Sequence, residues 1–410
     1  MFDKLFLSNF IWLAIIRVGR IAAPLVLIPI LSKTFGNDKL GIYLLFLSVA
    51  NWLALVVDYG FVFSATKEVA SKRDDIHTLR KILSEVTSAK ILLILCLFLV
   101  SFPILVLFKN LWLVIVLGSI SGIITGLVPL WYFQGTERSK LPAVCDLIFY
   151  LLLVPVALLA SKYDLSVYFV VFIYIVLRVI VLLYTTIVVM KELNISSIHI
   201  SFKGAFNALK LGSGMAFFRL STTMYITLNG IIVGLILSPL SLVIFSIPEK
   251  IARGIVALLS PLSQAIFPRL SYLVEKTNNS NNHFVNSMFI SIFFGLSLSV
   301  GLFFLSPYLV SLFLSDNQNE ASQVLKYFSV LPVLVSISNS FGLQYLVVMG
   351  YEKVFNKIIF SAAFMNLLMI YPLINFFEVQ GAVYSVLITE SYVSTMMFIA
   401  FIMTRGRGKC

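Results

Sequence analysis

The sequence predicts an all-α integral membrane protein, because its composition is too apolar for water and its apolar residues occur in long runs. Of its 410 residues, 60% are hydrophobic and 12% are charged. A soluble domain has about 45–50% apolar and about 25% charged residues. This composition excludes a soluble enzyme, a nucleic-acid-binding protein and a disordered scaffold. The net charge of +12 comes mostly from basic residues in short loops, where they act as signals of membrane topology.

Twelve apolar runs are long enough to cross the hydrocarbon core of a bilayer, which is about 30 Å thick and needs about 20 residues of helix. They lie at about 10–32, 40–63, 84–108, 111–133, 142–160, 165–190, 207–237, 241–266, 284–306, 326–349, 355–377 and 380–403. Each run is continuously apolar, whereas the strands of a transmembrane barrel alternate. The first run carries Arg17 and Arg20 and lacks a small-residue cleavage site, so we expect a membrane helix there, not a signal peptide.

The distribution of Lys and Arg predicts how these runs are oriented, since cytoplasmic loops are enriched in basic residues. The flanks on one side of the membrane hold eighteen basic residues, and the opposite flanks hold five. Both termini are therefore expected in the cytoplasm. An odd number of spans would break this alternation, so the charge pattern supports twelve.

The two halves of the chain resemble each other at an offset of 202 residues. Arg17 corresponds to Arg219 and Lys67 to Arg269, without a gap over about fifty residues. Six spans return the chain to its starting side, so the predicted halves run parallel, a known transporter plan with the substrate path at the repeat interface. The predicted domains are a six-helix bundle at 1–190, a cytoplasmic amphipathic connector helix at 191–206 and a second six-helix bundle at 207–410.

Seven basic residues lie inside the predicted spans, where each costs roughly 2.5–3.5 kcal/mol near a helix centre. Lys90 is close enough to a cytoplasmic end for its ammonium to snorkel. The other six are candidate binding residues for an anionic substrate, because guanidinium groups offer paired donors to phosphate oxygens. These six are Arg17, Arg20, Arg178, Arg219, Lys250 and Arg253. The alternative is that each cation is half of a structural ion pair.

Acids inside the spans are fewer than the cations. Glu249 and Glu390 are deep, and Glu249 stands four residues before Arg253, the spacing of a helical ion pair. Asp58 and Asp146 lie near cytoplasmic ends. We take Asp58, Glu249 and Glu390 as candidate counter-ions or coupling-ion sites. The resulting excess of buried positive charge favours a water-filled cationic cavity between the halves.

Other motifs favour packing over chemistry. The small residues Gly118, Gly122 and Gly126 recur every fourth position, the pattern of close helix–helix packing. The sequence holds no phosphate-binding Gly-x4-Gly-Lys loop and no His-Glu-x2-His motif. We therefore expect no bound metal and no cofactor.

Several segments together resemble the bacterial polysaccharide flippases, the O-antigen (Wzx-type) exporters of the multidrug/oligosaccharidyl-lipid/polysaccharide superfamily. The order and spacing of these segments along nearly the whole chain carry the resemblance. The segments are Asp58–Phe61, Ser64–Val69, Trp131–Gly135 followed by Glu137, Pro248–Lys250, Ser260–Gln264, Phe267–Ser271, Gly381–Ala382 and Glu390.

This resemblance implies two six-helix bundles in a V-shaped cleft like that of the MATE transporters. It implies a transporter of the bacterial inner membrane that moves an undecaprenyl-pyrophosphate-linked glycan from the cytoplasmic to the periplasmic leaflet by alternating access, coupled to a H⁺ or Na⁺ gradient. Expected partners are that glycan lipid, membrane lipid and other membrane proteins of polysaccharide assembly, with no nucleic acid.

Two alternatives stay open at this point. A cation-coupled exporter of small drugs would use the same scaffold, although a cationic drug favours an acidic cavity. An integral-membrane polysaccharide polymerase or glycosyltransferase would need a sizeable aqueous loop for its catalytic groups. The sequence leaves open the sugar, the coupling ion and the oligomeric state.

Overall fold

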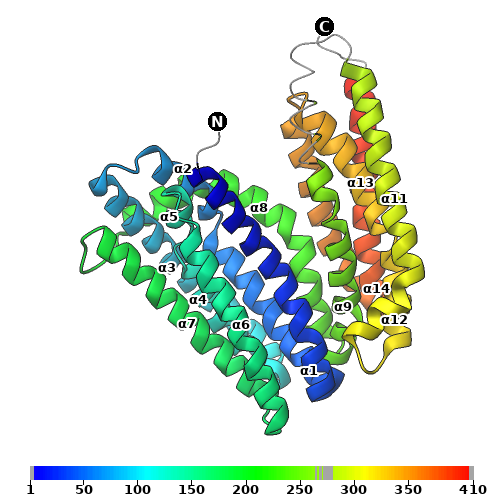
Figure 1. The fold of residues 1–410 in the computed structure, drawn as a ribbon, viewed down its shortest axis with the longest axis horizontal. Coiled ribbons are helices and arrows are strands. Elements are labelled where there is room, and N and C mark those ends of the chain that lie inside the picture. Colours follow the sequence, from blue (N-terminus) through cyan, green and yellow to red (C-terminus); the bar gives the residue numbers. More distant parts are fainter. Residues whose placement is uncertain (1–3, 264–265, 267–269, 271–279, 406–410) are drawn as a thin grey trace. The chain divides into compact units, whose positions relative to one another are not determined.

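The computed structural model describes residues 4–263, 266, 270 and 280–405, and these residues form helices without any strand. The helices before the middle of the chain are α1 (Lys4–Asp58), α2 (Phe61–Ser71), α3 (Ile76–Leu107), α4 (Trp112–Leu127), α5 (Leu130–Gly135), α6 (Lys140–Lys162) and α7 (Val167–Glu192). The helices that follow are α8 (Phe202–Ile236), α9 (Pro239–Val256), α11 (Ser280–Phe313), α12 (Gln318–Phe328), α13 (Leu331–Phe341) and α14 (Glu352–Arg405) (Figure 1).

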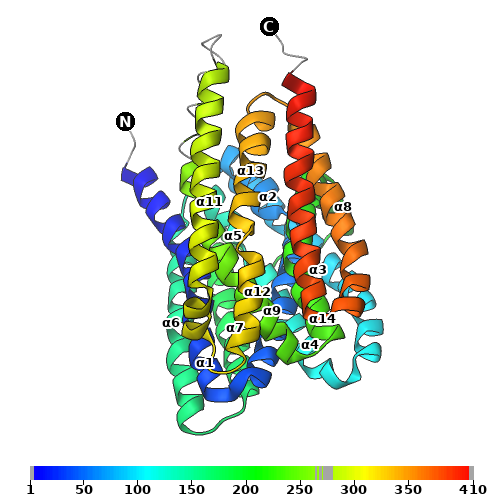
Figure 2. The ribbon, with the colours of Figure 1, turned by 90° about the vertical axis from the view of Figure 1, so that its right-hand side faces the viewer.

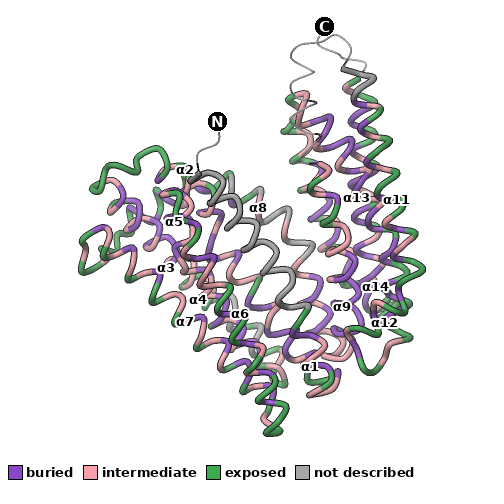
Figure 3. Tube along the Cα trace, in the orientation of Figure 1, coloured by how far each residue is buried: buried purple, intermediate pink, exposed green. Residues whose placement is uncertain are grey.

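Eight of the described helical segments are long and apolar enough to cross a membrane, which confirms an all-α, multi-pass membrane protein. Large apolar side chains form exposed faces on these helices, for example those of Phe293 and Phe304 on α11. Figure 3 shows exposed residues recurring along α11. In a bilayer these faces contact lipid tails, so their exposure costs nothing. The finer count of twelve separate spans stays a prediction.

Two long helices each cover two of the predicted apolar runs. Helix α1 continues through Gly36, which has φ 75° and ψ 170°, and α14 continues through Glu378, with φ 51° and ψ −127°. Both residues therefore leave the helical region of the backbone and mark a sharp change of direction. Glycine carries no penalty at such a positive φ, whereas the backbone at Glu378 is strained by about 1–3 kcal/mol.

The predicted run at 326–349 differs in the structure, where the helical segment begins earlier and is interrupted. Helix α12 ends at Phe328, and α13 starts at Leu331 with Pro332 in its first turn. Proline lacks an N–H and clashes with the preceding turn, so α12 cannot continue through it. Figure 2 shows α13 beside its contact partners α11 and α14.

The chain divides into two compact units, residues 1–223 and 224–410, so that their boundary falls inside α8. The segment 191–206, expected to be one connector helix, is helical only at its two ends: α7 ends at Glu192, α8 begins at Phe202, and residues 193–201 between them form no helix. Its cytoplasmic place between two bundles stays a prediction. The connector is bonded to α3 instead. Arg80 Nε donates to the Leu193 carbonyl at 2.7 Å, and the Ser201 N–H donates to Ser88 Oγ at 3.0 Å.

The beginning of α8 also packs on the first unit. Gly212 lies against the rings of Tyr59 and Phe61, and a Cβ at Gly204 would lie 3.0 Å from Glu85 Cγ. These contacts explain why the first part of α8 belongs to the first unit, although the repeat in the sequence assigns α8 to the second half.

A stripe of glycines holds α4 against α1 in the first unit. A Cβ at Gly122 would lie 2.6 Å from the carbonyl oxygen of Ala50, and one at Gly126 would lie 2.6 Å from Val57 Cβ. A Cβ at Gly118 would lie 2.9 Å from Val49 Cβ. The prediction that these glycines serve close helix packing is confirmed.

We therefore expect Gly122→Ala to destabilise the protein by about 1–3 kcal/mol, because the added methyl group meets backbone that cannot move aside. The measurement is thermal unfolding of the purified protein in detergent. Gly301→Ala on α11 is the matched control, since nothing lies within 4 Å of a Cβ there. Equal stability of the two variants would contradict this account of the α1–α4 contact.

Candidate functional site

Three ion pairs in the described helices involve three of the six predicted anion-binding cations. Two lie in the first unit, Arg219 with Asp58 and Arg178 with Asp146, and one lies in the second, Arg253 with Glu249. In two of these pairs, Arg219–Asp58 and Arg178–Asp146, the cation and its acid are far apart in the sequence. The fold thus supplies partners that residue spacing alone does not reveal.

Asp58 and Arg219 join the end of α1 to α8. The Arg219 guanidinium donates to Asp58 Oδ2 and lies 5.8 Å from the centre of the Phe63 ring. Asp58 is 8% exposed. The chain turns directly after it, because Tyr59 and Gly60 both have positive φ, and this turn fixes the carboxylate at the end of the helix.

Lys90 lies near this pair and does not snorkel, so that prediction is wrong. It is 2% exposed, and its Nζ donates to the Gly126 carbonyl at 2.7 Å. In a continuing helix the Leu130 N–H would bond to that carbonyl, but it bonds to the carbonyl of Val128 instead. Helix α4 ends before Pro129, and the carbonyls of its last turn attract a cation.

Arg178 and Asp146 join α7 to α6. Arg178 Nη1 donates to Asp146 Oδ1 at 2.8 Å, and both side chains are largely buried. The guanidinium lies 3.8 Å from the centre of the Phe149 ring, and the rings of Tyr150 and Tyr174 each lie 5.7 Å away. Aromatic faces stabilise a desolvated cation by about 2 kcal/mol or more. This setting gives Arg178 one fixed position.

Asp146 was missing from the predicted counter-ions, although the sequence places it as near a cytoplasmic end as Asp58, which was among them. Arg178 was placed at mid-span by the same measure. The ends of the two apolar runs do not show how far one antiparallel helix is shifted along the other. In the structure, the shift brings the two side chains together. A useful signal was the helical spacing of Asp146, Phe149 and Tyr150, which puts one acid and two rings on neighbouring turns.

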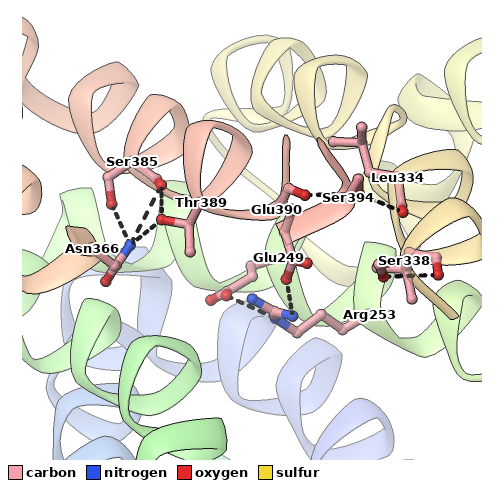
Figure 4. A network of polar contacts seen from close by, with 10 residues as sticks. Glu249, Arg253, Leu334, Ser338, Asn366, Ser385, Thr389, Glu390 and Ser394 are labelled. Carbon is pink, nitrogen blue, oxygen red and sulfur yellow. Dashed lines mark hydrogen bonds and ion pairs between the residues drawn. The ribbon is translucent and has the colours of Figure 1, made fainter. Parts of the chain in front are cut away.

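The second unit holds a cluster of one cation and two acids. Arg253 Nε donates to Glu249 Oε1 at 2.9 Å, which confirms the predicted helical pair on α9. Arg253 Nη1 also lies 3.7 Å from Glu390 Oε1 on α14. Figure 4 shows Arg253 reaching both carboxylates, which are 6% and 4% exposed as whole residues. The guanidinium therefore links α9 to α14 through charge.

Polar side chains extend this cluster along α14. Ser394 donates to the carbonyls of Glu390 and Leu334, each at 2.8 Å, and so ties α14 to α13. Before Glu390 in the chain, Asn366 Nδ2 donates at 3.0 Å to the side-chain oxygens of Ser385 and Thr389 (Figure 4). Hydropathy could not reveal these neutral residues. Only the spacing of four between Ser385 and Thr389, which puts both on one helix face, could be read from the sequence.

The remaining predicted residues contribute less to the described geometry. Arg17 and Arg20 lie on α1, but their side chains are outside the described residues. Lys250 follows Glu249 on α9 and is partly exposed. Within the described residues, the cations occur as separate charge clusters in the two units, and the role of all six in binding one substrate stays a prediction.

We expect Asp146→Ala to destabilise the protein by about 3–5 kcal/mol, because it leaves the Arg178 guanidinium buried without its carboxylate. Replacing both residues, as Asp146→Leu with Arg178→Met, should cost less than the single change, since no buried charge remains. Thermal unfolding in detergent measures both effects. A double variant less stable than Asp146→Ala would show that this pair contributes more than mutual neutralisation.

Solved structures with the same fold are membrane transporters. The lipid II flippase MurJ in its inward closed conformation matches 95% of this chain and 87% of its own, with a TM-score of 0.74 and 16% identity. An inward-facing multidrug resistance MATE family transporter of the MOP superfamily matches 97% of this chain and 98% of its own, with a TM-score of 0.72 and 12% identity. At these identities the likeness establishes the fold alone.

The sequence itself points to a narrower group. The chain is 27% identical over 395 residues to a protein of Escherichia coli (strain K12) named "Putative O-antigen transporter", and the match covers 95% of each chain. Residues 6–274, about two thirds of the sequence, match a family described as polysaccharide biosynthesis protein. The resemblance seen in the sequence is thereby confirmed, and this chain belongs to the polysaccharide biosynthesis protein family.

Proposed function

We propose that this chain is a transporter of the O-antigen type that moves an undecaprenyl-pyrophosphate-linked oligosaccharide across the bacterial inner membrane. Transport runs from the cytoplasmic to the periplasmic leaflet by alternating access, with both termini in the cytoplasm. The family, the named relative and the fold support a polysaccharide transporter. The observation that carries the substrate class is the presence of partly buried guanidinium groups, those of Arg219 and Arg253, in the membrane helices of both units.

Buried guanidinium groups suit a pyrophosphate because their paired donors match its oxygens. Arg219 is the strongest candidate, since its side chain is 28% exposed, whereas that of Arg178 is only 8% exposed and enclosed by aromatic rings. A ligand can therefore reach Arg219 more easily. In this proposal the substrate phosphate takes the place of Asp58 beside Arg219.

That exchange would explain a need for an ion gradient. A carboxylate that loses its guanidinium partner in a low-dielectric site is costly unless it is neutralised. A proton bound to Asp58 would remove this cost while the phosphate occupies Arg219. Release of the phosphate would then restore the Asp58–Arg219 pair and displace the proton.

A second coupling site is proposed in the Glu249–Arg253–Glu390 cluster. The contact of Arg253 with Glu390 is longer than that with Glu249, and it joins two different helices, α9 and α14. A proton or a sodium ion at Glu390 would weaken this joint and leave the Glu249–Arg253 pair intact. Neutralisation of Glu390 would thus favour a conformational change in the second unit, while Arg253 stays paired with Glu249.

The transport proposal is tested by locating lipid-linked sugar in cells that lack this protein. We expect labelled undecaprenyl-linked intermediates to accumulate in the cytoplasmic leaflet, together with loss of the surface polymer. Reintroducing the protein should restore both. Normal movement to the periplasmic leaflet with unpolymerised units would contradict a flippase and point to an enzyme acting after translocation.

The role of Arg219 is tested by a pair of variants. We expect Arg219→Ala to abolish transport although the protein still inserts at a normal level. The double variant Arg219→Ala with Asp58→Ala should also be inactive, because the phosphate has lost its donor. Recovery of transport in the double variant would show that Arg219 only balances Asp58. Arg405→Ala, at the exposed end of α14, is the control for loss of a positive charge.

The role of Glu390 is tested in proteoliposomes with an imposed gradient. Glu390→Gln keeps the shape of the side chain and removes its charge, so we expect a transport rate that responds less to the H⁺ or Na⁺ gradient, since only the Asp58 site still takes up a proton. Glu320→Gln on the exposed part of α12 should leave that response unchanged. An unaltered gradient response in Glu390→Gln would exclude Glu390 as the coupling site.

A further inference from the structure

Two hollows of opposite character meet at one ion pair in the first unit. The larger has a volume of about 810 Å³, runs between α6 and α7, and is lined mostly by apolar side chains, with the charged residues Glu137, Arg138, Lys140 and Glu192 at one end. The smaller has a volume of about 340 Å³ and is lined mainly by polar and charged residues. Arg138 and Glu192, which form an ion pair, line both. An apolar groove that opens into a charged pocket has the form of a site for an amphiphile.

The wall of the apolar groove is a continuous helical stripe. The side chains at every fourth position of α6 line it, and so do side chains one turn apart on α7. Most of them are close to half exposed, as expected of groups that wait for a hydrocarbon neighbour. The stripe consists of Val144, Ile148, Leu152, Leu177, Ile180 and Tyr184.

The length of the groove matches one leaflet. From Lys140 to Leu152 along α6, a helical rise of 1.5 Å per residue gives about 18 Å. Half of the hydrocarbon core is about 15 Å thick. An acyl chain of a phospholipid fits this length, whereas an undecaprenyl chain is far longer than the groove. The charged end lies at the side of the membrane where the Lys/Arg bias predicts the cytoplasm.

The charged pocket combines both signs in equal number. Arg73 and Arg138 line it together with Asp74 and Glu192. One Glu192 oxygen accepts from Arg138, and the other accepts from the Tyr132 hydroxyl at 3.1 Å. Arg73 is also paired, with Glu137 at 3.5 Å. The side chains of Arg73 and Arg138 are 53% and 59% exposed, so the donors that these pairs leave over are accessible.

Equal charges of both signs complement a zwitterion. A phosphate can accept from Arg138 and Arg73 while a neighbouring ammonium group donates to Asp74 or Glu192. A pyrophosphate or a purely anionic headgroup would meet as many carboxylates as guanidinium groups. We infer that this groove and pocket together bind one phospholipid with a zwitterionic amine headgroup, of the phosphatidylethanolamine type, from the cytoplasmic leaflet. This site lies within one unit and does not depend on the transported substrate.

Native mass spectrometry of the purified full chain tests the headgroup. The protein is incubated in detergent with phosphatidylethanolamine, phosphatidylglycerol and undecaprenyl phosphate at equal concentrations. We expect one phosphatidylethanolamine to be retained about tenfold more than either competitor, the difference made by one charge-assisted hydrogen bond. Equal or stronger retention of phosphatidylglycerol would overturn the zwitterionic assignment. Preferential retention of undecaprenyl phosphate would show that the groove holds the substrate tail instead.

A pair of neighbouring substitutions tests the location. Leu152→Trp fills the groove and should lower phosphatidylethanolamine retention at least about tenfold, because the acyl chain is displaced. Leu151→Trp is the matched control: Leu151 is exposed on the same helix but does not line the groove. Equal retention by the two variants would place the bound lipid elsewhere.

A native cysteine gives a readout that does not depend on retention in the gas phase. Cys145 lines the groove, whereas Cys96 is exposed on α3 outside it. In detergent, added phosphatidylethanolamine should slow the reaction of Cys145 with an apolar maleimide and leave that of Cys96 unchanged. Leu152→Trp should abolish this protection relative to Leu151→Trp. The absence of protection in the unaltered protein would refute lipid binding in the groove.

Discussion

The structure depends on one constraint, the cost of placing guanidinium groups in a bilayer core. An isolated charge there costs several kcal/mol, and the guanidinium groups of Arg178, Arg219 and Arg253 each lie against a carboxylate. In every case the partner or an additional partner comes from a different helix. These pairs therefore hold particular helices together as well as neutralising charge. Because an unpaired charge is costly, a bound ion or an anionic ligand that replaces one partner of a pair can also change the contact between the two helices.

The three clusters are suited to different tasks by their surroundings. Arg178 has an acid on one side and aromatic rings on others, which fixes its position and favours a structural role. Arg219 has an acid and a more open side, which leaves room for an anion. Arg253 has acids on two helices, so loss of one contact leaves the other in place. On these grounds the transport proposal assigns phosphate binding and one proton site to the second cluster, and a second coupling site to the third.

Hydropathy predicted the helices well because the bilayer allows little else. Continuous apolar runs can only be helices when every backbone group must be satisfied within its own segment. Glu249 and Arg253 could also be paired from the sequence, since their spacing on one helix defines their distance. Asp58 and Asp146 could not be paired in this way, because their partners are on other helices and the stagger of those helices is set by packing. Lys90 illustrates the same limit: its acceptor is a carbonyl freed by a helix end 36 residues away.

The position of Arg219 shows how packing can override an internal repeat. The sequence repeat assigns this residue to the second half and aligns it with Arg17. By contacts it belongs to the first unit, because α8 begins on α3 and the end of α1 and because Asp58 holds its guanidinium. Helix α8 then continues past the boundary into the second unit. An event at Arg219, such as exchange of Asp58 for a phosphate, therefore acts on a helix that the two units share. Among the described ion pairs, only Arg219–Asp58 includes a residue of α8, the helix that contains the boundary between the two units.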